Sequence, residues 1–455
     1  MRPVPLDGIK QMRTDDIGQT RGSKVGRRRQ RTGQEEKNPA QMVELVLENV
    51  AHGGAVTAHD ASGRLYFVRY GLPGERVRAK VTRSQSKFSW ADVEAVLEPS
   101  PMRISEEHDG AADLGHMSRQ GQLSWKSDVL TDQLRRVGGP EVSAQVNSLW
   151  QGGVVPVESA PGDSATGPVW GRRTRANFTV APTGELAVRG YRSHVLIPVN
   201  AHPLLDPVFE RAGVFTDRKW RGIWRPGDTV TLVAPTGSEP QVVVGERAYS
   251  LTGERVDPVT QWTVEVFSSS ADFRVASTGF WQTHRAAASL LAERVVSFSG
   301  DLSGKKVMEL YSGAGLFTYF LSQEAGDRGH IVTLEGSEQA VADAERNLGD
   351  MAGGAPVELF VGAVDAEAVA QLAAALQGPP DLVVLDPPRQ GAGREVIKAI
   401  GGLNCFRVVL VSCDPAAGAR DLKFFVEQGF KLTKLEAWDL FPGTHHLEFV
   451  ARLDR

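Results

Sequence analysis

The carboxyl-terminal region of the chain, residues 271–455, alternates short apolar runs with longer amphipathic stretches. Helical stretches such as EQAVADAERNL separate several of the apolar runs. Alternation of strand and helix predicts an α/β domain with a parallel, doubly wound sheet, in which a ligand lies beyond the carboxyl ends of the strands. The apolar runs with the pattern of buried strands are KKVMELYSG, GHIVTLEGS, PVELFVG, DLVVLDPP and RVVLVSC.

Two further regions precede this domain. Residues 42–98 alternate apolar and polar side chains in short runs broken by glycine-containing turns, which predicts a small β-barrel of about five strands. Residues 99–270 mix strand-like segments, RANFTVAP and GELAVRGYRS, with LSWKSDVLTDQLRRVGG, which has helical periodicity and a glycine stop. A central α+β domain is therefore expected there.

The composition is that of a globular protein, with 41% hydrophobic and 23% charged residues among 455. Two cysteines exclude a disulfide framework and favour a reducing compartment. No apolar run approaches the ~20 residues of a membrane span, and the first thirty residues lack the apolar stretch of a signal peptide. We expect a cytoplasmic monomer that does not enter a membrane.

The net charge of the chain is −4, but the amino-terminal segment is basic. Residues 1–41 hold ten Lys or Arg against five Asp or Glu, concentrated in RGSKVGRRRQR. Such a run predicts a disordered tail with no specific role, and contact with nucleic-acid phosphates is the alternative.

The first strand–helix loop, ELYSGAGLFT, contains Gly313 and Gly315, which allow a tight turn and a close approach of a ligand to the backbone. The dinucleotide fingerprint needs a third glycine where this chain has Thr318, which disfavours NAD and FAD. Glu335 ends the next strand and is placed to accept both hydroxyls of a ribose, although a solvated glutamate at a helix start is the simpler alternative. A glycine loop and an acid without the fingerprint suggest S-adenosylmethionine.

Two later strands end in reactive side chains. Asp386 follows an apolar run and precedes a rigid Pro-Pro turn, and a structural cap is its alternative role. Cys413 ends the following strand, directly before Asp414 and Pro415. If the two strands are neighbours, Cys413 and Asp386 share one rim, which would leave the thiol available as a nucleophile. Cys405 has no motif around it and is expected to be a buried structural thiol.

A fourth candidate lies near the carboxyl terminus, in LFPGTHHLEFVARLDR. Glu448 falls within an apolar strand pattern, where desolvation would raise the pKa of its carboxyl group, as in a general acid or base. The adjacent His445 and His446 should point to opposite sides of a strand. Because no cluster has metal-ligand spacing, no metal site is expected.

These motifs resemble those of the RNA 5-methyluridine (uracil-C5) methyltransferase family. The resemblance covers residues 42–98, through VAHGGAV and GLPGERVRAKV of an OB-like TRAM barrel, and the chain from about Phe280 onward. It implies a Rossmann-like class I methyltransferase domain, RNA binding by the barrel, and a uridine of tRNA or 23S rRNA as substrate. By this resemblance Cys413 is the nucleophile, Glu448 is the base, and S-adenosylmethionine is contacted by Gln282, Tyr311, Glu335 and Asp386. The motifs that carry it are FWQTH, LYSGAGLFT, LEGS, LDPPR, SCDPAAGARDL and FPGTHHLE.

The chain departs from the family pattern in two places. Many members carry a four-cysteine iron–sulfur site, but the corresponding segment HDGAADLGHMSRQGQLSWK has no cysteine, so we expect no cluster. Ser312 stands where relatives often have Cys, and Leu316 stands where some relatives have Asn. These changes affect the choice of subfamily and RNA and leave the chemistry intact.

The expected chemistry is covalent catalysis. Carbon 5 of uracil is a poor nucleophile until a thiolate adds to carbon 6, and a base must later remove the proton from carbon 5. The uracil should be flipped out or drawn from a loop, and Trp281 is expected either to stack on a base or to lie in the core.

Two other functions remain open from the residues. An amino-methyltransferase acting on adenine or cytosine would have an aromatic residue after Pro-Pro, where this chain has Arg389, and would need neither Cys413 nor Glu448. A non-catalytic RNA-binding or folding factor could retain the scaffold. Cofactor-dependent labelling of RNA separates an enzyme from such a factor.

Overall fold

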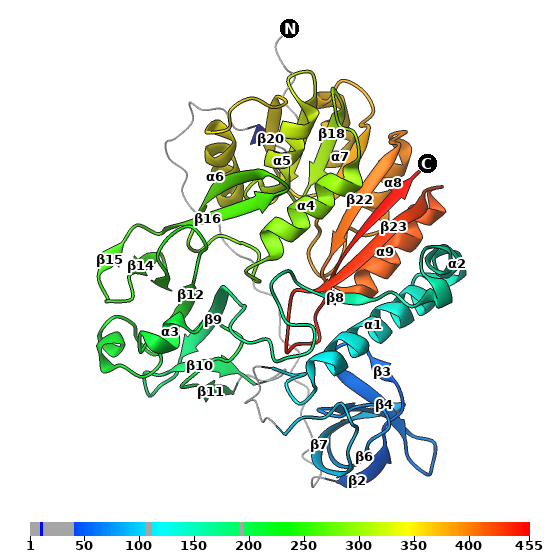
Figure 1. Cartoon of the computed structure of the whole chain (residues 1–455), viewed down its shortest axis with the longest axis vertical. Coiled ribbons are helices and arrows are strands. Elements are labelled where there is room, and N and C mark those ends of the chain that lie inside the picture. Colours follow the sequence, from blue (N-terminus) through cyan, green and yellow to red (C-terminus); the bar gives the residue numbers. More distant parts are fainter. Residues whose placement is uncertain (1–9, 12–40, 106–111, 191–194) are drawn as a thin grey trace. The chain divides into compact units, whose positions relative to one another are not determined.

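The computed structural model describes residues 10–11, 41–105, 112–190 and 195–455 (Figure 1). The expected basic tail, residues 1–41, lies outside the described residues except for residues 10–11 and 41. The chain divides into two compact units, a smaller one within residues 11–101 and a larger one that contains Met102–Arg455. Among the described residues, none of the helices combines the length and the apolarity needed to cross a membrane.

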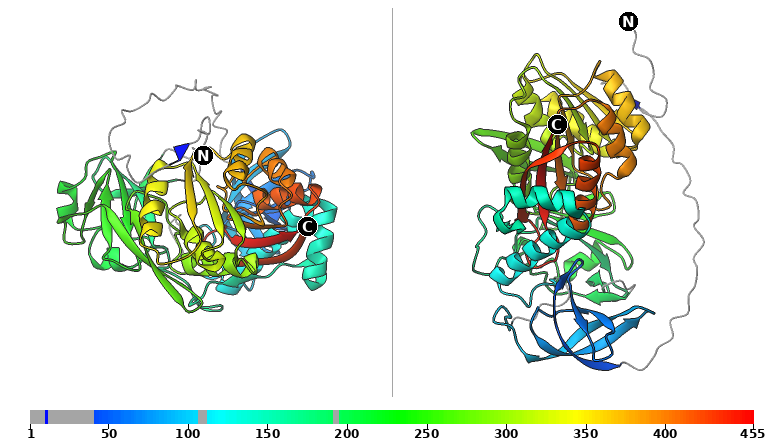
Figure 2. Two further views of the ribbon diagram at one scale, coloured as in Figure 1. Left: turned by 90° about the horizontal axis from the view of Figure 1, so that it is seen from above. Right: turned by 90° about the vertical axis from the view of Figure 1, so that its right-hand side faces the viewer.

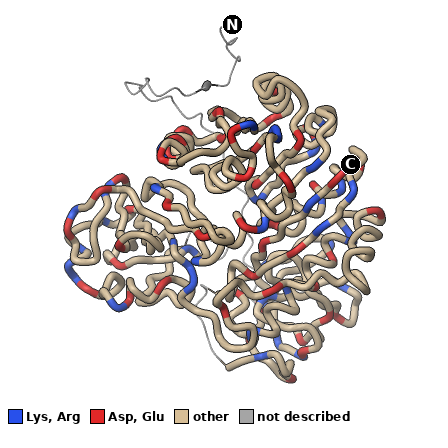
Figure 3. Tube along the Cα trace, turned by 45° about the horizontal axis from the view of Figure 1, so that its top comes forward, with Lys and Arg blue, Asp and Glu red and all other residues tan. Residues whose placement is uncertain are grey.

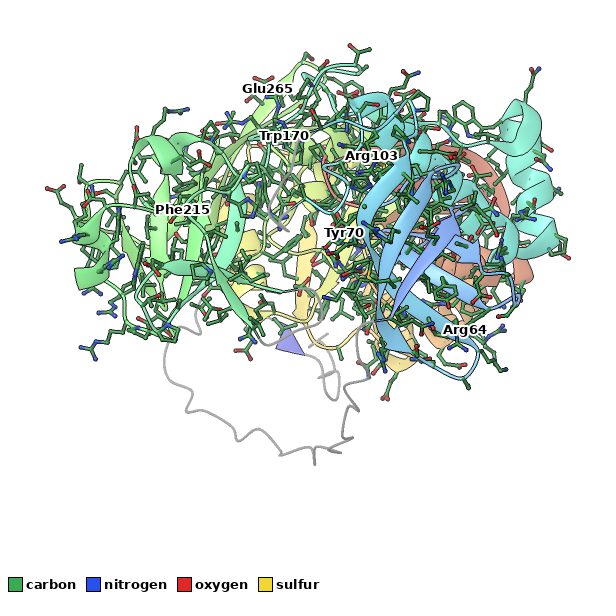
Figure 4. All side chains as sticks on the ribbon, turned by 90° about the horizontal axis from the view of Figure 1, so that it is seen from below. Arg64, Tyr70, Arg103, Trp170, Phe215 and Glu265 are labelled. Carbon is green, nitrogen blue, oxygen red and sulfur yellow. The ribbon has the colours of Figure 1, made fainter. Side chains whose placement is uncertain are left out.

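The smaller unit contains a six-stranded sheet with the order β2-β6-β7-β5-β4-β3. The short strands predicted for residues 42–98 are present, six instead of about five, and an OB-like or TRAM barrel stays a prediction. Apolar side chains at alternate positions of these strands, such as Val68, Val77 and Ala91, form the core. Arg64, labelled in Figure 4, donates to Ser89 Oγ at 3.0 Å. The strands are β2 Met42–Val46, β3 Val50–Ala51, β4 Ala55–His59, β5 Leu65–Arg69, β6 Arg76–Ser84 and β7 Phe88–Glu98.

In the larger unit, a seven-stranded antiparallel sheet has the order β11-β10-β9-β12-β13-β14-β15. RANFTVAP contains β9 and GELAVRGYRS contains β10, as predicted. Phe215, labelled in Figure 4, lies against Phe178 in the core beside this sheet, with ring centroids 5.5 Å apart. The bounds are β9 Arg175–Val180, β10 Leu186–Arg189, β11 Leu196–Pro198, β12 Thr229–Val233, β13 Gln241–Val244, β14 Arg247–Tyr249 and β15 Arg255–Val256, with helix α3 Val208–Arg211 and a hairpin of β16 Val259–Val266 and β17 Ser269–Ala276.

Helix α1 Arg119–Arg136 covers most of the segment with the predicted helical periodicity, and a second helix, α2 Gly139–Leu149, begins at its last residue. α1 begins earlier than predicted, because the Ser118 side chain accepts from the Gly121 N–H and caps the helix. Gly138 separates the helices: a Cβ there would lie 2.3 Å from the Leu134 carbonyl oxygen, so only glycine fits. The chain then forms β8 Val157–Ser159.

A nine-stranded sheet with the order β1-β20-β19-β18-β21-β22-β24-β23-β8 carries the candidate site. The predicted parallel sheet is confirmed for five strands, which lie in the order β20, β19, β18, β21 and β22. Strand β24 pairs antiparallel with β22. Strand order reverses at β18, so a crevice is expected where β18 and β21 end. The strands are β1 Lys10–Gln11, β18 Lys306–Leu310, β19 His330–Glu335, β20 Val357–Val361, β21 Leu382–Leu385, β22 Arg407–Ser412, β23 Lys431–Asp439 and β24 Glu448–Asp454.

Helices lie on both faces of this sheet (Figure 1, Figure 2). Alternate strand residues separate the two cores: Val307 and Val409 face α4 and α5, while Met308 and Val408 face α7, α8, α9 and, beside them, α1 and α2. This two-sided burial explains why the central strands read as continuous apolar runs. The helices are α4 Ala287–Ser299, α5 Leu316–Ala325, α6 Glu338–Gly349, α7 Ala366–Ala375, α8 Arg394–Gly402 and α9 Pro415–Glu427.

Candidate active site

The glycine loop joins β18 to α5 and contains three residues with left-handed backbone. Their φ values are 65° at Tyr311, 56° at Gly313 and 84° at Gly315. A Cβ added to Gly315 would lie 3.2 Å from the Ala344 Cβ, so this glycine lets α5 approach α6. A Cβ on Gly313 would meet nothing within 4 Å, so the loop faces open space there. The position of a Cβ is therefore filled by α6 at Gly315 and open at Gly313, and cofactor binding by both glycines stays a prediction.

Glu335 ends β19 and is tied to the glycine loop. Its carboxylate accepts hydrogen bonds from the Gly313 N–H at 3.0 Å and from the Ser337 N–H at 2.8 Å. Each carboxylate oxygen keeps a further lone pair, because an ionised carboxylate has about four acceptor positions. Glu335 therefore orders the loop and can still accept hydroxyl groups of a ligand.

A second acid, Glu309, was missed by the sequence reasoning. It lies in β18 with 1% of its surface exposed, and its Oε2 accepts from Thr318 Oγ at 2.6 Å. Burial, with smaller contributions from the charges of Asp386 and Glu335, raises the pKa of Glu309 to about 8, although the hydrogen bond from Thr318 acts in the opposite direction. The available signal was an acid inside the apolar run KKVMELYSG, paired with the residue that replaces the third glycine.

We expect the free energy of unfolding to fall as pH rises from about 4.5 to about 8, in part through Glu309. Between these values folded Glu309 keeps a proton that the unfolded chain has released. The free energy of unfolding therefore falls across this range by about 1.4 kcal/mol per unit of pKa shift. Glu309→Gln keeps the acceptor for Thr318 and cannot titrate. Denaturant unfolding of both proteins at pH 5, 6, 7 and 8 measures this, and equal slopes in the two proteins would contradict it.

Asp386, Cys413 and Glu448 lie at the ends of three neighbouring strands. Leu385 pairs with Leu410 and Ser412 pairs with Phe449, so the next position of the second ladder sets Cys413 opposite Glu448. The condition for a shared rim, that β21 and β22 are neighbours, is therefore met. Cys413 is half-buried and Glu448 is 3% exposed.

The turns that follow these strands are fixed by acids on or beside α9. Asp414 caps α9 by accepting from the Ala416 and Ala417 N–H groups at 3.0 and 2.8 Å, and Cys413 is the single residue between the end of β22 and this cap. Asp421, within α9, accepts from the Ala392 N–H at 2.6 Å and so holds the loop after Asp386. Both reactive strand ends are thereby anchored to one helix.

The rim favours the neutral forms of its acidic groups. Burial, together with the negative charges of Glu448 and Asp386, raises the pKa of Cys413 to about 12. Burial, followed by Asp386, also raises the pKa of Glu448 well above its usual value, in the direction expected. Burial and then Glu335 raise the pKa of Asp386. The positive charge of Arg389 acts in the opposite direction on Cys413 and Glu448.

Three other residues considered in the sequence, Trp281, Gln282 and Cys405, lie in different environments. Trp281 lies in the core, 5.6 Å from Trp262 and 5.5 Å from Phe273 between ring centroids, so stacking on a base is wrong. The Gln282 carbonyl accepts from Thr174 Oγ at 3.4 Å, and none of the hydrogen bonds within the described ranges joins Gln282 to the rim. Cys405 is buried and donates to the Arg407 carbonyl at 2.9 Å, as expected of a structural thiol.

The adjacent histidines lie in a turn, not in a strand. Residues 440–447 form the connection between β23 and β24, which we call the β23–β24 turn. The rings of His445 and His446 are 4.0 Å apart between centroids, so the expectation of opposite sides is wrong. Burial, with the nearby charges of His445 and Arg389, lowers the pKa of His446 to about 3. Within the part of the chain that the structure describes, no group of three or more metal-binding side chains is present.

Comparisons with known proteins agree with these features. Residues 379–455, which include Asp386, Cys413 and Glu448, match the family model described as tRNA (Uracil-5-)-methyltransferase. A relative from Streptomyces avermitilis, named as an uncharacterized RNA methyltransferase, is 34% identical over 90% of this chain and 98% of its own length. A relative of the same description from Streptomyces coelicolor is 33% identical over 90% of this chain and 92% of its own length.

The fold also matches a solved structure. The crystal structure of Pyrococcus abyssi tRNA (uracil-54, C5)-methyltransferase, in complex with S-adenosyl-L-homocysteine, superimposes with a TM-score of 0.61 and 20% identity. The match covers 90% of this chain and 99% of that one. This similarity supports the class I methyltransferase fold expected for residues 271–455. The chain belongs to the RNA methyltransferase family that includes the tRNA (uracil-5-)-methyltransferases.

Proposed function

We propose that this enzyme transfers a methyl group from S-adenosylmethionine to carbon 5 of a uridine in structured RNA, either tRNA or 23S rRNA. The observation that carries the proposal is the pairing of β22 with β24, which sets a thiol opposite a buried carboxyl group. A covalent route through carbon 6 needs these two groups, one to add and one to take the proton from carbon 5. Methylation of an exocyclic amine needs neither.

The glycine loop and Glu335 fit S-adenosylmethionine. Gly313 faces open space, and the Glu335 carboxylate beside it keeps acceptor positions for ribose hydroxyls. Asp386 and Tyr311 lie at the ends of the two strands where the sheet order reverses, and by the family resemblance Gln282 completes the site. When bound, the cofactor supplies the methyl group as an electrophile.

Cys413 would act as the nucleophile. The thiol first releases its proton to solvent, and the thiolate sulfur then forms a bond to carbon 6. The electrons of the carbon 5–carbon 6 double bond become an enolate shared by carbon 5 and the oxygen on carbon 4, which makes carbon 5 nucleophilic. A thiol with a pKa of about 12 is protonated at neutral pH, so neighbouring groups must favour the loss of its proton. Arg389 supplies the positive charge that favours the thiolate.

Glu448 would act as the base. After methylation it takes the proton from carbon 5, the double bond forms again, and the sulfur is expelled. A raised pKa makes its carboxylate a stronger base than an ordinary glutamate. Burial therefore strengthens Glu448 as a base, whereas it disfavours the Cys413 thiolate, which the charge of Arg389 favours.

RNA must reach this rim with the uracil ring exposed, so we infer that the target uridine leaves its stack. Lys and Arg are interspersed with Asp and Glu along the described chain (Figure 3), so binding depends on local groups. Arg78 and Lys80 lie at alternate exposed positions of β6 in the smaller unit. We propose that this unit, as a TRAM barrel, binds RNA next to the target, and that the enzyme acts as a cytoplasmic monomer.

Deletion of the gene and mapping of 5-methyluridine test the proposed function. We expect the modification to disappear from at least one uridine of tRNA or 23S rRNA and to return when the wild-type gene is restored. Mass spectrometry of nuclease-digested tRNA and rRNA, prepared separately, measures this and identifies the substrate. Unchanged 5-methyluridine in both pools would contradict the proposal.

A further inference from the structure

Helix α1 carries three buried polar side chains on one face. Arg119, Gln122 and Lys126 are spaced by three and four residues, so they lie along one stripe of the helix. A helix packed into a core normally has apolar side chains at such positions. All three instead bind the chain between the end of β23 and Glu448.

The strongest contacts hold Asp439, the last residue of β23. Its carboxylate accepts from the Arg119 guanidinium and from the Lys126 ammonium group, and the side chains of Asp439 and Lys126 have no exposed surface. Asp439 Oδ1 also accepts from the Phe441 N–H at 3.0 Å, while Lys126 Nζ donates to the Phe441 carbonyl at 3.0 Å. The start of the β23–β24 turn is therefore fixed through both backbone groups of Phe441.

Gln122 holds the middle of the turn. Its Oε1 accepts from the Gly443 N–H at 2.9 Å, and its Nε2 donates to the carbonyls of Leu114 and Met117 at 3.3 and 3.2 Å. The Leu114 N–H in turn donates to the Gly443 carbonyl at 2.9 Å. The amide of Gln122 is fully bonded, so its orientation is defined.

The segment before α1 holds the end of the turn. Asp113 accepts from the His445 N–H at 3.1 Å and also binds the His445 ring. Contacts thus occur at residues 439, 441, 443 and 445, and Glu448 follows three residues later. The chain is therefore attached at every second residue from Asp439 to His445, close to the proposed base.

Stability alone is a poor reason for such a stripe. Apolar side chains of similar volume often replace a buried ion cluster with no loss of stability, whereas removal of one partner leaves a costly unpaired charge. Directional bonds fix geometry more closely than apolar packing does. A base must come within hydrogen-bond reach of its proton, and small displacements slow proton transfer strongly.

We propose that the polar stripe of α1, Arg119, Gln122 and Lys126, acts as a positioning device that sets Glu448 for removal of the proton from carbon 5. This inference rests on the proposed function. It assigns no contact with substrate to the three residues, which act through Asp439 and the β23–β24 turn.

The test replaces the ion cluster without leaving an unpaired charge. We expect the triple variant Arg119→Met, Lys126→Met, Asp439→Leu to fold and to form the covalent adduct, but to release methylated RNA at least about tenfold more slowly than the wild type. Gln122→Met, which removes only neutral bonds, should act in the same direction. Tritiated S-adenosylmethionine and total RNA from a strain lacking the gene provide the assay. After denaturation and nuclease digestion, label that stays with protein reports the adduct, and label in nucleosides reports product.

Leu130→Ala is the matched control, because Leu130 is buried in α1 and belongs to the apolar core. It should lower the unfolding temperature and leave the ratio of adduct to product at the wild-type value. A wild-type ratio in the triple variant, or in Gln122→Met if the triple variant does not fold, overturns the proposal. Failure of the wild-type enzyme to label uridine would instead overturn the proposed function.

Discussion

The Cys413→Ala variant is expected to lose methyl transfer to RNA, by on the order of 10³-fold or more, while it still binds S-adenosylmethionine. Without the sulfur no bond to carbon 6 forms, and carbon 5 stays too weakly nucleophilic to accept a methyl group. The cofactor groups proposed at Gly313, in the loop after β18, and at Glu335, at the end of β19, do not belong to β22, so the substitution leaves them in place. Transfer of tritium from labelled S-adenosylmethionine to RNA measures turnover, and calorimetry measures cofactor binding.

Cys405→Ala is the matched control for this experiment. Cys405 is the other cysteine of the chain, and it is buried with its thiol bonded to a backbone carbonyl. This variant should lose some stability and keep its turnover at temperatures where it is folded. Wild-type turnover by Cys413→Ala, measured beside this control, would end the proposal of a thiol nucleophile.

The Glu448→Gln variant is expected to trap the reaction after methyl transfer. Glutamine has nearly the shape of glutamate and cannot accept the proton from carbon 5, so turnover should fall by about 10²–10⁴-fold. The sulfur cannot be expelled while that proton remains. A denaturing gel should therefore show a slower band that contains protein, RNA and the labelled methyl group.

The double variant Cys413→Ala, Glu448→Gln separates the two roles. It should give no slower band, because the adduct needs the sulfur that Cys413 supplies. A band that persists in the double variant would place the covalent bond on another residue. Loss of turnover in Glu448→Gln with no band at all would contradict the role of Glu448 as the base for carbon 5.

Much of the fold follows from local patterns. The apolar runs before Glu335, Asp386 and Cys413 became parallel strands of one sheet, with β18 between the first two, because strands buried on both faces are apolar throughout and a polar residue marks where they reach the rim. Asp414 and Pro415 stop β22, since an Asp cap and a Pro at the first helical turn favour a helix start. Such signals depend on a few adjacent residues and can be recognised without knowledge of the rest of the chain.

Other features depend on contacts between distant segments. Glu309 was not singled out in the sequence, and the packing around β18 shows that it is buried and bound to Thr318. Trp281 could have been exposed or buried, and the rings of Trp262 and Phe273 decided that it lies in the core. The histidine pair was assigned to a strand that in fact begins later, at Glu448.

The sequence by itself determined the strand–helix alternation, the family resemblance and the residue types of the proposed chemistry, because each of these depends on residues that are close together in the chain. Only the tertiary structure decided that β24 returns antiparallel beside β22 and so sets Glu448 opposite Cys413, 35 positions earlier in the chain. It also decided that Lys126 binds Asp439 across more than 300 residues of sequence. The physical reason is that pairing register, burial and the resulting pKa shifts arise from which segments meet, and local side-chain preferences do not encode this.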